Sequence, residues 1–244
     1  MHLLVSVRCR TEVAAAVEGG ADIVDAKEPG RGSLGAVSSG VLAEIAGSLP
    51  LGVPLSVALG DPRDDEELRR ALEALPGGEP GGPRYLKLGF AGVEREATVR
   101  VTLESAVARA AALEGQPAVI AVAYADYGLA GSLPPDAIAA LAAASGAAGV
   151  LLDTWTKDGR DLFAWISPPE LRAWAGETKL AGLLAAVAGS LGLGSMRSVV
   201  GAEPDIVGVR GAACEGGRLG VVSAARVRAV RAELDEAGEC HLSP

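Results

Sequence analysis

The sequence has few of the residues from which disulfide, zinc and histidine-based sites are built. Its three cysteines, Cys9, Cys214 and Cys240, are odd in number, widely spaced and without a CxxC pair. This pattern fits neither a disulfide framework nor a zinc site, and a reducing cytoplasm is the compartment it favours. The two histidines, His2 and His241, stand at the ends of the chain, which argues against a histidine base or metal ligand.

Positive charge and long apolar runs are also scarce. Lysine and arginine together number 22 against 31 acidic residues, and the formal net charge is −9. Nucleic-acid binding requires clustered Lys and Arg, so we expect no nucleic-acid partner and only a small, locally held phosphate. The most hydrophobic stretch, 180–193, falls short of the roughly 18 apolar residues of a membrane span, and the segment 1–7 is too short for a signal peptide. These absences predict a soluble, cytoplasmic protein with no membrane partner.

The length and the spacing of short apolar runs predict the fold. The chain has 244 residues, close to the roughly 250 that are typical of a single (β/α)₈ barrel. Apolar runs that read as buried parallel strands occur at 3–7, 23–26, 54–59, 85–88, 119–123, 149–152, 184–188 and 206–209. Eight strand signals, each followed by a helical pattern, predict an α/β single-domain TIM barrel over 1–244.

The segments between these runs are consistent with that fold. Apolar side chains recur at helical spacing in each of three segments, at Leu68, Leu72 and Leu75, at Leu103, Val107 and Ala110, and at Val227, Val230 and Leu234. A doubly wound open sheet is the alternative, but no glycine fingerprint follows the first run. The Gly/Pro-rich insert 76–83 is interpreted as a long loop between a helix and a strand, away from the catalytic face. The tail 238–244 is expected to fray.

The most informative motif is the segment 25–35, in which a buried strand opens into a glycine-rich loop. Asp25 and Lys27 lie two residues apart, so both side chains project from the same face of the strand, while Val24 and Ala26 project from the other. Because helices cover the outside of a barrel, the charged face is predicted to line its mouth. A lysine there is a candidate Schiff-base former, and a structural ion pair between Asp25 and Lys27 is the alternative.

Two further lysines occupy equivalent places. Lys87 shares a strand face with Tyr85, and Asp153 ends the sixth predicted strand with Lys157 four residues later. Several cations around one mouth repel one another, which lowers the pKa of at least one amine toward neutrality, as a nucleophile needs. The carboxylates of Asp25 and Asp153 would then position the amines or transfer protons.

Small residues directly after the seventh and eighth strands predict a phosphate site. Barrels commonly bind phosphate there through backbone N–H groups, and Gly189, Ser190, Gly211 and Ala212 occupy these loops. A turn or helix-cap role is the alternative for the glycines.

Three other residues near strand ends have two interpretations each. Tyr124 and Asp126 form either a proton relay or an ordinary satisfied pair, and Cys214 is either a nucleophile or a small buried filler. The buried filler is the better interpretation of Cys214, because no histidine is available to activate the thiol.

These motifs resemble those of the (5-formylfuran-3-yl)methyl phosphate synthases of methanofuran biosynthesis. The similarity runs in order along nearly the whole chain, through segments 19–27, 32–36, 85–89, 123–126, 152–154, 157–159, 188–190 and 205–214. As a set these motifs are specific. The departures are the Ala-rich helices, the Gly/Pro insert and Trp155, which stands inside the loop between Asp153 and Lys157 and could alter the mouth.

The resemblance implies a (β/α)₈ barrel that joins two glyceraldehyde 3-phosphate molecules into a furan aldehyde that keeps one phosphate. It implies that Lys27 is the Schiff-base lysine and Lys87 the proton acceptor, with Asp25, Asp153 and Lys157 in support, and that no metal or cofactor is required. Two alternatives remain open: another lysine-dependent aldolase for a phosphorylated sugar, and a non-catalytic phosphate-binding barrel. The sequence leaves open whether the protein is a homo-oligomer.

Overall fold

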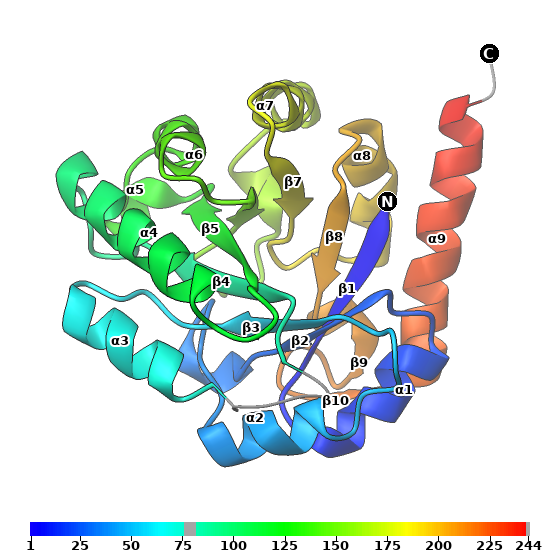
Figure 1. Ribbon diagram of the computed structural model, residues 1–244. Coiled ribbons are helices and arrows are strands. Elements are labelled where there is room, and N and C mark those ends of the chain that lie inside the picture. Colours follow the sequence, from blue (N-terminus) through cyan, green and yellow to red (C-terminus); the bar gives the residue numbers. More distant parts are fainter. Residues whose placement is uncertain (76–81, 243–244) are drawn as a thin grey trace.

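A computed structural model describes residues 1–75 and 82–242 of the chain. Within these residues, eight parallel strands pair in chain order and the last pairs with the first, which closes a barrel (Figure 1). The strands are β1 (His2–Val7), β2 (Ile23–Ala26), β3 (Leu55–Ala58), β4 (Tyr85–Gly89), β5 (Ala118–Tyr124), β6 (Gly149–Asp153), β7 (Leu184–Val187) and β8 (Ile206–Val209). All eight predicted strands are present within one residue of their predicted ends, and the predicted TIM barrel is confirmed.

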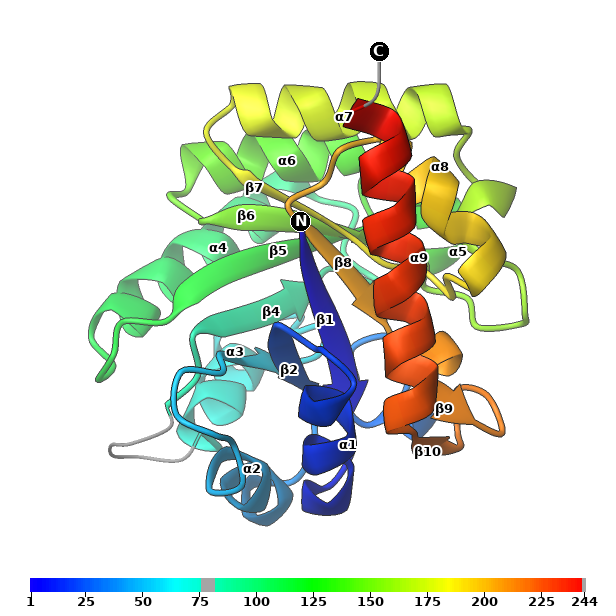
Figure 2. The same ribbon diagram turned by 90° about the vertical axis from the view of Figure 1, so that its right-hand side faces the viewer.

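Helices cover the outside of the barrel. They are α1 (Val13–Glu18), α2 (Ser39–Ala46), α3 (Asp65–Glu73), α4 (Glu96–Ala111), α5 (Tyr127–Ala130), α6 (Pro135–Ala144), α7 (Pro168–Leu180), α8 (Met196–Gly201) and α9 (Ala224–Leu242). Short 3₁₀ turns are η1 (Arg10–Glu12), η2 (Pro29–Arg31), η3 (Leu162–Ala164), η4 (Leu193–Ser195) and η5 (Gly211–Ala213). Figure 2 shows α9 running along the barrel beside α8.

Local chemistry explains where several helices begin. At α3 the side chain of Asp64 accepts a hydrogen bond from the amide of Glu67, and acidic residues fill the first turn. At α7 the side chains of Ser167 and Glu170 each bind the other's backbone amide, and a proline follows Ser167. Such caps satisfy amides that have no partner inside the helix and commonly stabilise it by about 1 kcal/mol.

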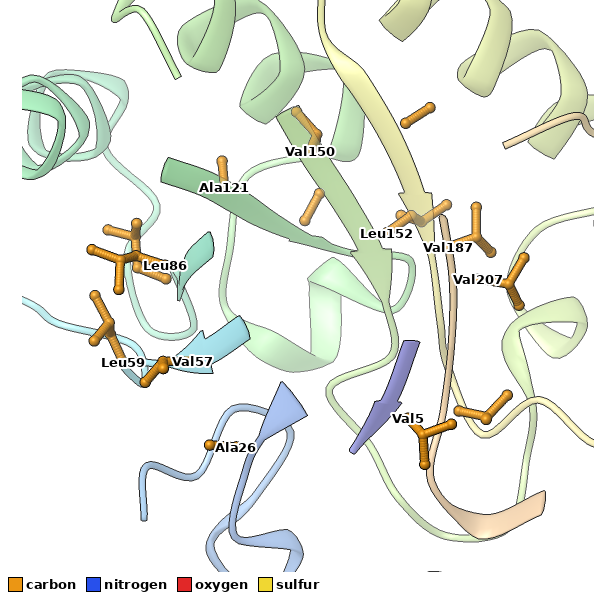
Figure 3. Packing of buried hydrophobic residues seen from close by; sticks show 14 of the residues in the cluster. Val5, Ala26, Val57, Leu59, Leu86, Ala121, Val150, Leu152, Val187 and Val207 are labelled. Carbon is orange, nitrogen blue, oxygen red and sulfur yellow. The ribbon is translucent and has the colours of Figure 1, made fainter. Parts of the chain in front are cut away.

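The apolar core lies mainly between the strands and the helices. Outward-facing strand residues are fully or almost fully buried. Figure 3 shows how the side chains of Val5, Val57, Leu86, Val150 and Val207 lie in this cluster. Burying one such side chain stabilises the fold by about 1.5–3 kcal/mol. A second, smaller cluster of apolar side chains lies inside the barrel. Strand alternation therefore separates a continuous outer core from an interior in which polar side chains are also present.

The predicted tail 238–244 and the predicted long loop 76–83 are described only in part by the structure. The tail 238–244, which the sequence predicts to fray, is helical as far as Leu242, where α9 ends. Among the residues of α9 whose burial is described, Leu234 is the last that is buried, and the ion pair between Arg231 and Asp235, four residues apart at 3.0 Å, lies at this point of the helix. Residues 243–244 lie outside the described residues, as do residues 76–81 of the predicted long loop.

The described helices give no candidate for a membrane span, since none combines the necessary length with a sufficiently apolar composition.

Candidate active site

A cavity of about 390 Å³ opens inside the barrel, and residues of all eight barrel strands line it. At its mouth lie the loops that follow β6, β7 and β8, represented by Lys157, Gly189 and Gly211. Toward the other end of the barrel it reaches Tyr85 and Leu184, the first residues of β4 and β7. The active sites of TIM barrels lie at the carboxyl ends of the strands, so this cavity is the candidate active site.

All five predicted catalytic residues line this one cavity. They are Asp25, Lys27, Lys87, Asp153 and Lys157. Asp25 and Lys27 face inward because they alternate with Val24 and Ala26, which belong to the outer core. Lys27 is only 7% exposed and Lys87 only 3%. The structure thus brings together largely buried amines and carboxylates from three strands, β2, β4 and β6, and from the loops that follow β2 and β6.

Asp25 pairs with Lys87 on β4 rather than with its sequence neighbour Lys27. The Lys87 Nζ lies 2.7 Å from Asp25 Oδ1, and the Ser6 hydroxyl donates to Asp25 Oδ2 at 2.8 Å. Burial by itself would raise the pKa of Asp25, but the ammonium groups of Lys87 and Lys27 outweigh burial and hold it below its ordinary value. Asp25 is therefore a buried carboxylate whose main partner is Lys87.

Asp153 organises the loop after β6. Its Oδ1 accepts from Lys157 Nζ at 2.8 Å and from the Thr154 amide at 2.7 Å, while Oδ2 accepts from the Ser33 hydroxyl at 3.0 Å. Burial would raise the pKa of Asp153, but Lys157 and Lys27 outweigh burial and hold it well below its usual range. Asp153 thus fixes Lys157 at the mouth and remains charged near Lys27.

Lys27 differs from the other two lysines of the cavity. Among the described residues its amine makes no hydrogen bond or ion pair, whereas Lys87 and Lys157 each contact a carboxylate. Burial, together with the charges of Lys87 and Lys157, lowers the pKa of Lys27 to about 8, although Asp153 and Asp25 act in the opposite direction. An amine with this pKa is about one tenth neutral at pH 7, which makes Lys27 a candidate nucleophile.

This pKa predicts how Lys27 reacts as the pH changes. Only the neutral amine is nucleophilic, so its labelling rate with a lysine-selective acylating reagent should rise about tenfold per pH unit and level off near pH 8. Quantitative mass spectrometry of the labelled peptides measures this, with the exposed Lys179 as the reference within the same sample. A labelling rate of Lys27 that still rises about tenfold per pH unit near pH 10 would contradict a pKa of about 8 for this amine.

The four residues of the predicted phosphate site also line the cavity. Gly189 and Ser190 follow β7, and Gly211 and Ala212 follow β8. None of their amides donates a hydrogen bond to another described residue. Gly189 has φ +112°, and a side chain there would crowd Thr154, so the chain needs glycine at this position. The loops after β7 and β8 therefore present backbone N–H groups at the mouth of the cavity that have no acceptor among the described residues.

The other strand-end candidates lie outside the cavity lining. Tyr124 donates to Asp61 at 2.6 Å, and Asp126 accepts from the amides of Trp155 and Thr156 at 2.6 and 2.8 Å. Tyr124 and Asp126 are therefore not bonded to each other, and Asp126 instead holds the loop that carries Lys157. Cys214 is buried, and burial raises the pKa of its thiol, which agrees with the interpretation as a filler.

Sequence reasoning missed several polar residues that line the cavity or contact its lining. Ser6 and Ser56 flank Asp25 on the neighbouring strands, and the buried Ser56 hydroxyl has no hydrogen-bond partner among the described residues. Their alternation with apolar residues on β1 and β3 was a usable signal. Ser33 and Arg218 come from loops, and nothing in the local pattern places either one at the mouth.

Solved structures with this architecture support the fold alone. Phosphoribosyl anthranilate isomerase from Thermus thermophilus aligns with a TM-score of 0.64 at 19% identity, covering 97% of this chain and 99% of that chain. The 3-hexulose-6-phosphate synthase from Salmonella typhimurium gives 0.63 at 16% identity, with 97% and 100% covered.

Sequence comparisons are more specific. The (5-formylfuran-3-yl)methyl phosphate synthase of Methanothermobacter thermautotrophicus is 36% identical over 238 residues, which covers 96% of this chain and 99% of that protein. The protein of the same name from Methanosarcina barkeri is 32% identical over 233 residues, with 96% and 99% covered. A putative (5-formylfuran-3-yl)methyl phosphate synthase of Streptomyces griseus is 35% identical over 216 residues, with 88% and 86% covered.

A family model described as 4-HFC-P synthase matches residues 3–231. This match and the relatives at 32–36% identity confirm the resemblance seen in the sequence. They show that the chain belongs to the 4-HFC-P synthase family and is an enzyme of that family.

Proposed function

We propose that this enzyme joins two molecules of glyceraldehyde 3-phosphate through an imine formed on Lys27. The observation that carries the proposal is the Lys27 amine, which is buried in the cavity, lacks a carboxylate contact and has a pKa of about 8. The names of the relatives support a furan phosphate as the product in general terms. We propose glyceraldehyde 3-phosphate as the substrate and an imine on Lys27 as the covalent intermediate.

The first half of the reaction activates one triose. The Lys27 amine adds to the aldehyde carbon of the first triose and water leaves, which forms a protonated imine. This cation draws electrons from the neighbouring carbon, so a base can remove the proton there and leave an enamine. Lys87 is the proposed base, and the Asp25 carboxylate, 2.7 Å from its Nζ, positions the amine inside the cavity.

The second half forms the ring. The enamine carbon attacks the aldehyde of a second triose, and hydrolysis of the imine at the end of the cycle frees Lys27. Two C₃ phosphates lose one inorganic phosphate and two waters, which leaves a six-carbon furan aldehyde with one phosphate. We assign Lys157, held by Asp153 and Thr154 at 2.8 and 3.0 Å, to proton donation toward the departing oxygens.

The phosphate of a bound triose is assigned to the loops after β7 and β8. The amides of Gly189, Ser190, Gly211 and Ala212 line the cavity and have no partners among the described residues, so they are available to a phosphate oxygen. The positive charges of Lys27 and Lys157 in the same cavity also favour an anionic substrate.

Product analysis tests the function directly. The purified enzyme is incubated with glyceraldehyde 3-phosphate alone, and the furan aldehyde is identified by mass spectrometry and NMR, with released inorganic phosphate measured in parallel. One phosphate released per furan formed is the expected result. A non-aromatic sugar phosphate as the product would instead favour another lysine-dependent aldolase.

A carboxylate at position 211 should weaken substrate binding. A Cβ at Gly211 meets nothing closer than the Arg218 amide at 3.7 Å, so Gly211→Asp fits and brings a negative charge to the proposed phosphate site. Repulsion across a few ångströms should raise KM roughly 10- to 100-fold. Gly211→Asn has similar bulk without the charge and should raise KM less.

Steady-state kinetics of both variants measures the effect, with Gly194→Asp as a control. Gly194 lies in the exposed part of the loop after β7 and outside the cavity lining. Equal losses in Gly211→Asp and Gly211→Asn would show that bulk rather than charge is responsible and would count against a phosphate at this place.

A further inference from the structure

Two cations that line the cavity make no ion pair with a carboxylate of the described chain, Lys27 and Arg218. The other cationic side chains of the lining each have such a partner: Lys87 with Asp25, Lys157 with Asp153, and Arg210 with Glu12. Lys27 is accounted for as the proposed nucleophile. Arg218 is a half-buried guanidinium that forms no ion pair with a described carboxylate, and the proposed chemistry assigns it no role.

Arg218 stands on a hairpin whose backbone is held in place. The hairpin is formed by β9 (Cys214–Glu215) and β10 (Val221–Val222), directly after η5 and beside α9 (Figure 2). The carbonyls of residues 218 and 220 accept from Arg210, and the carbonyl of Leu219 accepts from Arg8 at 3.0 Å. Arg210 in turn binds the buried Glu12. Arginine side chains thus bind three successive carbonyls of this loop, so the backbone that carries the Arg218 side chain is held in a fixed position.

The guanidinium of Arg218 connects two loops across the mouth. One of its terminal nitrogens donates to the carbonyl of Gly32, in the loop after β2, at 2.6 Å. Next to Gly32, the Ser33 hydroxyl binds Asp153 and the carbonyl of Thr154. The remaining N–H donors of Arg218 have no partner among the described residues. Burial lowers the pKa of this guanidinium and outweighs the opposing charges of Asp153 and Glu28, neither of which forms an ion pair with it.

We propose that Arg218 binds the dianionic phosphate of the triose and selects phosphorylated over unphosphorylated aldehydes. This inference rests on the proposed function, in which the phosphate lies against Gly211 and Ala212, the residues beside Arg218 in the cavity wall. A guanidinium presents paired N–H groups that match two phosphate oxygens, which makes it a specific partner for this group. Its contact to Gly32 leaves the other donors for the ligand.

The Arg218 side chain therefore supplies both a positive charge and directed N–H donors at the mouth of the cavity. The amides after β7 and β8 are neutral donors, whereas Arg218 adds the full positive charge that a phosphate dianion requires. With phosphate and the Gly32 carbonyl both bound, Arg218 joins the loop after β8 to the loop that follows Lys27. A phosphorylated triose is thereby held near the amine, and glyceraldehyde without phosphate gains nothing from this contact.

Imine trapping with two aldehydes tests the proposal. Wild type, Arg218→Met and Arg218→Lys are reacted with increasing glyceraldehyde 3-phosphate or glyceraldehyde in the presence of borohydride, and the Lys27 adduct is quantified by mass spectrometry. In Arg218→Met the half-saturating concentration of the phosphorylated aldehyde should rise roughly 10- to 150-fold, the range expected for losing hydrogen bonds to a charged group. Glyceraldehyde trapping should change less than twofold. Arg218→Lys keeps the positive charge but lacks the paired N–H groups, so its half-saturating concentration should lie between those of wild type and Arg218→Met.

Controls separate the possible failures. Arg31→Met removes a charge from an exposed residue of the loop after β2, outside the cavity lining, and should leave both titrations as in wild type. Unchanged glyceraldehyde trapping in Arg218→Met shows that the fold and Lys27 are intact. A preserved preference for the phosphorylated aldehyde in Arg218→Met would overturn the role of Arg218. Absence of a Lys27 adduct in wild type with either aldehyde would overturn the proposed function instead.

Discussion

Lys27→Met should abolish both the borohydride-trapped adduct and furan formation, with a fall in kcat of roughly 10⁴- to 10⁶-fold, the range seen when a catalytic nucleophile or its partner is removed. The physical reason is that the Lys27 amine combines burial, a pKa of about 8 and freedom from any carboxylate contact. Lys87 and Lys157 each contact a carboxylate, so neither should replace it.

The measurement is intact-protein and peptide mass spectrometry after reduction, with product formation followed in parallel. Lys179→Met is the matched control, because Lys179 is exposed, lies outside the cavity lining and binds the carbonyl of Glu203. It should behave as wild type. An adduct of undiminished yield in Lys27→Met, located on Lys87 or Lys157, would move the nucleophile to that residue.

Lys87→Met should give the opposite combination, in which the imine still forms on Lys27 but little furan is released. Removing a general base usually lowers the rate roughly 10²- to 10⁴-fold, so kcat should fall within that range while the trapped adduct persists. This combination is expected because proton removal by Lys87 comes after imine formation on Lys27. Loss of trapping in a folded Lys87→Met protein would mean that Lys87 assists the formation of the imine itself.

The folding of that variant needs its own control. Lys87 is the main partner of the buried Asp25, and removing one member of a buried ion pair can destabilise a protein by about 3–5 kcal/mol. The double variant Lys87→Met with Asp25→Asn removes the uncompensated charge, and the Asn side chain can still accept from the Ser6 hydroxyl. Thermal unfolding should show that the double variant recovers stability, and turnover should stay low in both proteins.

The fold and much of the candidate site can be predicted from the sequence because they depend on local periodicity. Eight apolar runs indicate eight strands, and the structure has a strand at each of them. Alternation along β2 is sufficient to place Asp25 and Lys27 on the same face. The contact between Asp153 and Lys157 spans only four residues, so it too is apparent in the sequence. In all these cases the interacting groups are neighbours along the chain.

Only the tertiary structure decided which distant groups meet. Asp25 contacts Lys87 on β4, although Lys27 is its sequence neighbour, because side chains two apart on one strand project in parallel while barrel closure brings β4 within reach. Ser33 reaches Asp153 across 120 positions, and Arg218 reaches Gly32 across 186. Such contacts depend on strand register and on loop paths, which are set by the packing of the whole barrel rather than by any local pattern. The sequence by itself determined the barrel and its inward-facing lysines, and the tertiary structure decided that Lys27 and Arg218 are the two cations of the cavity left without a carboxylate in the described chain.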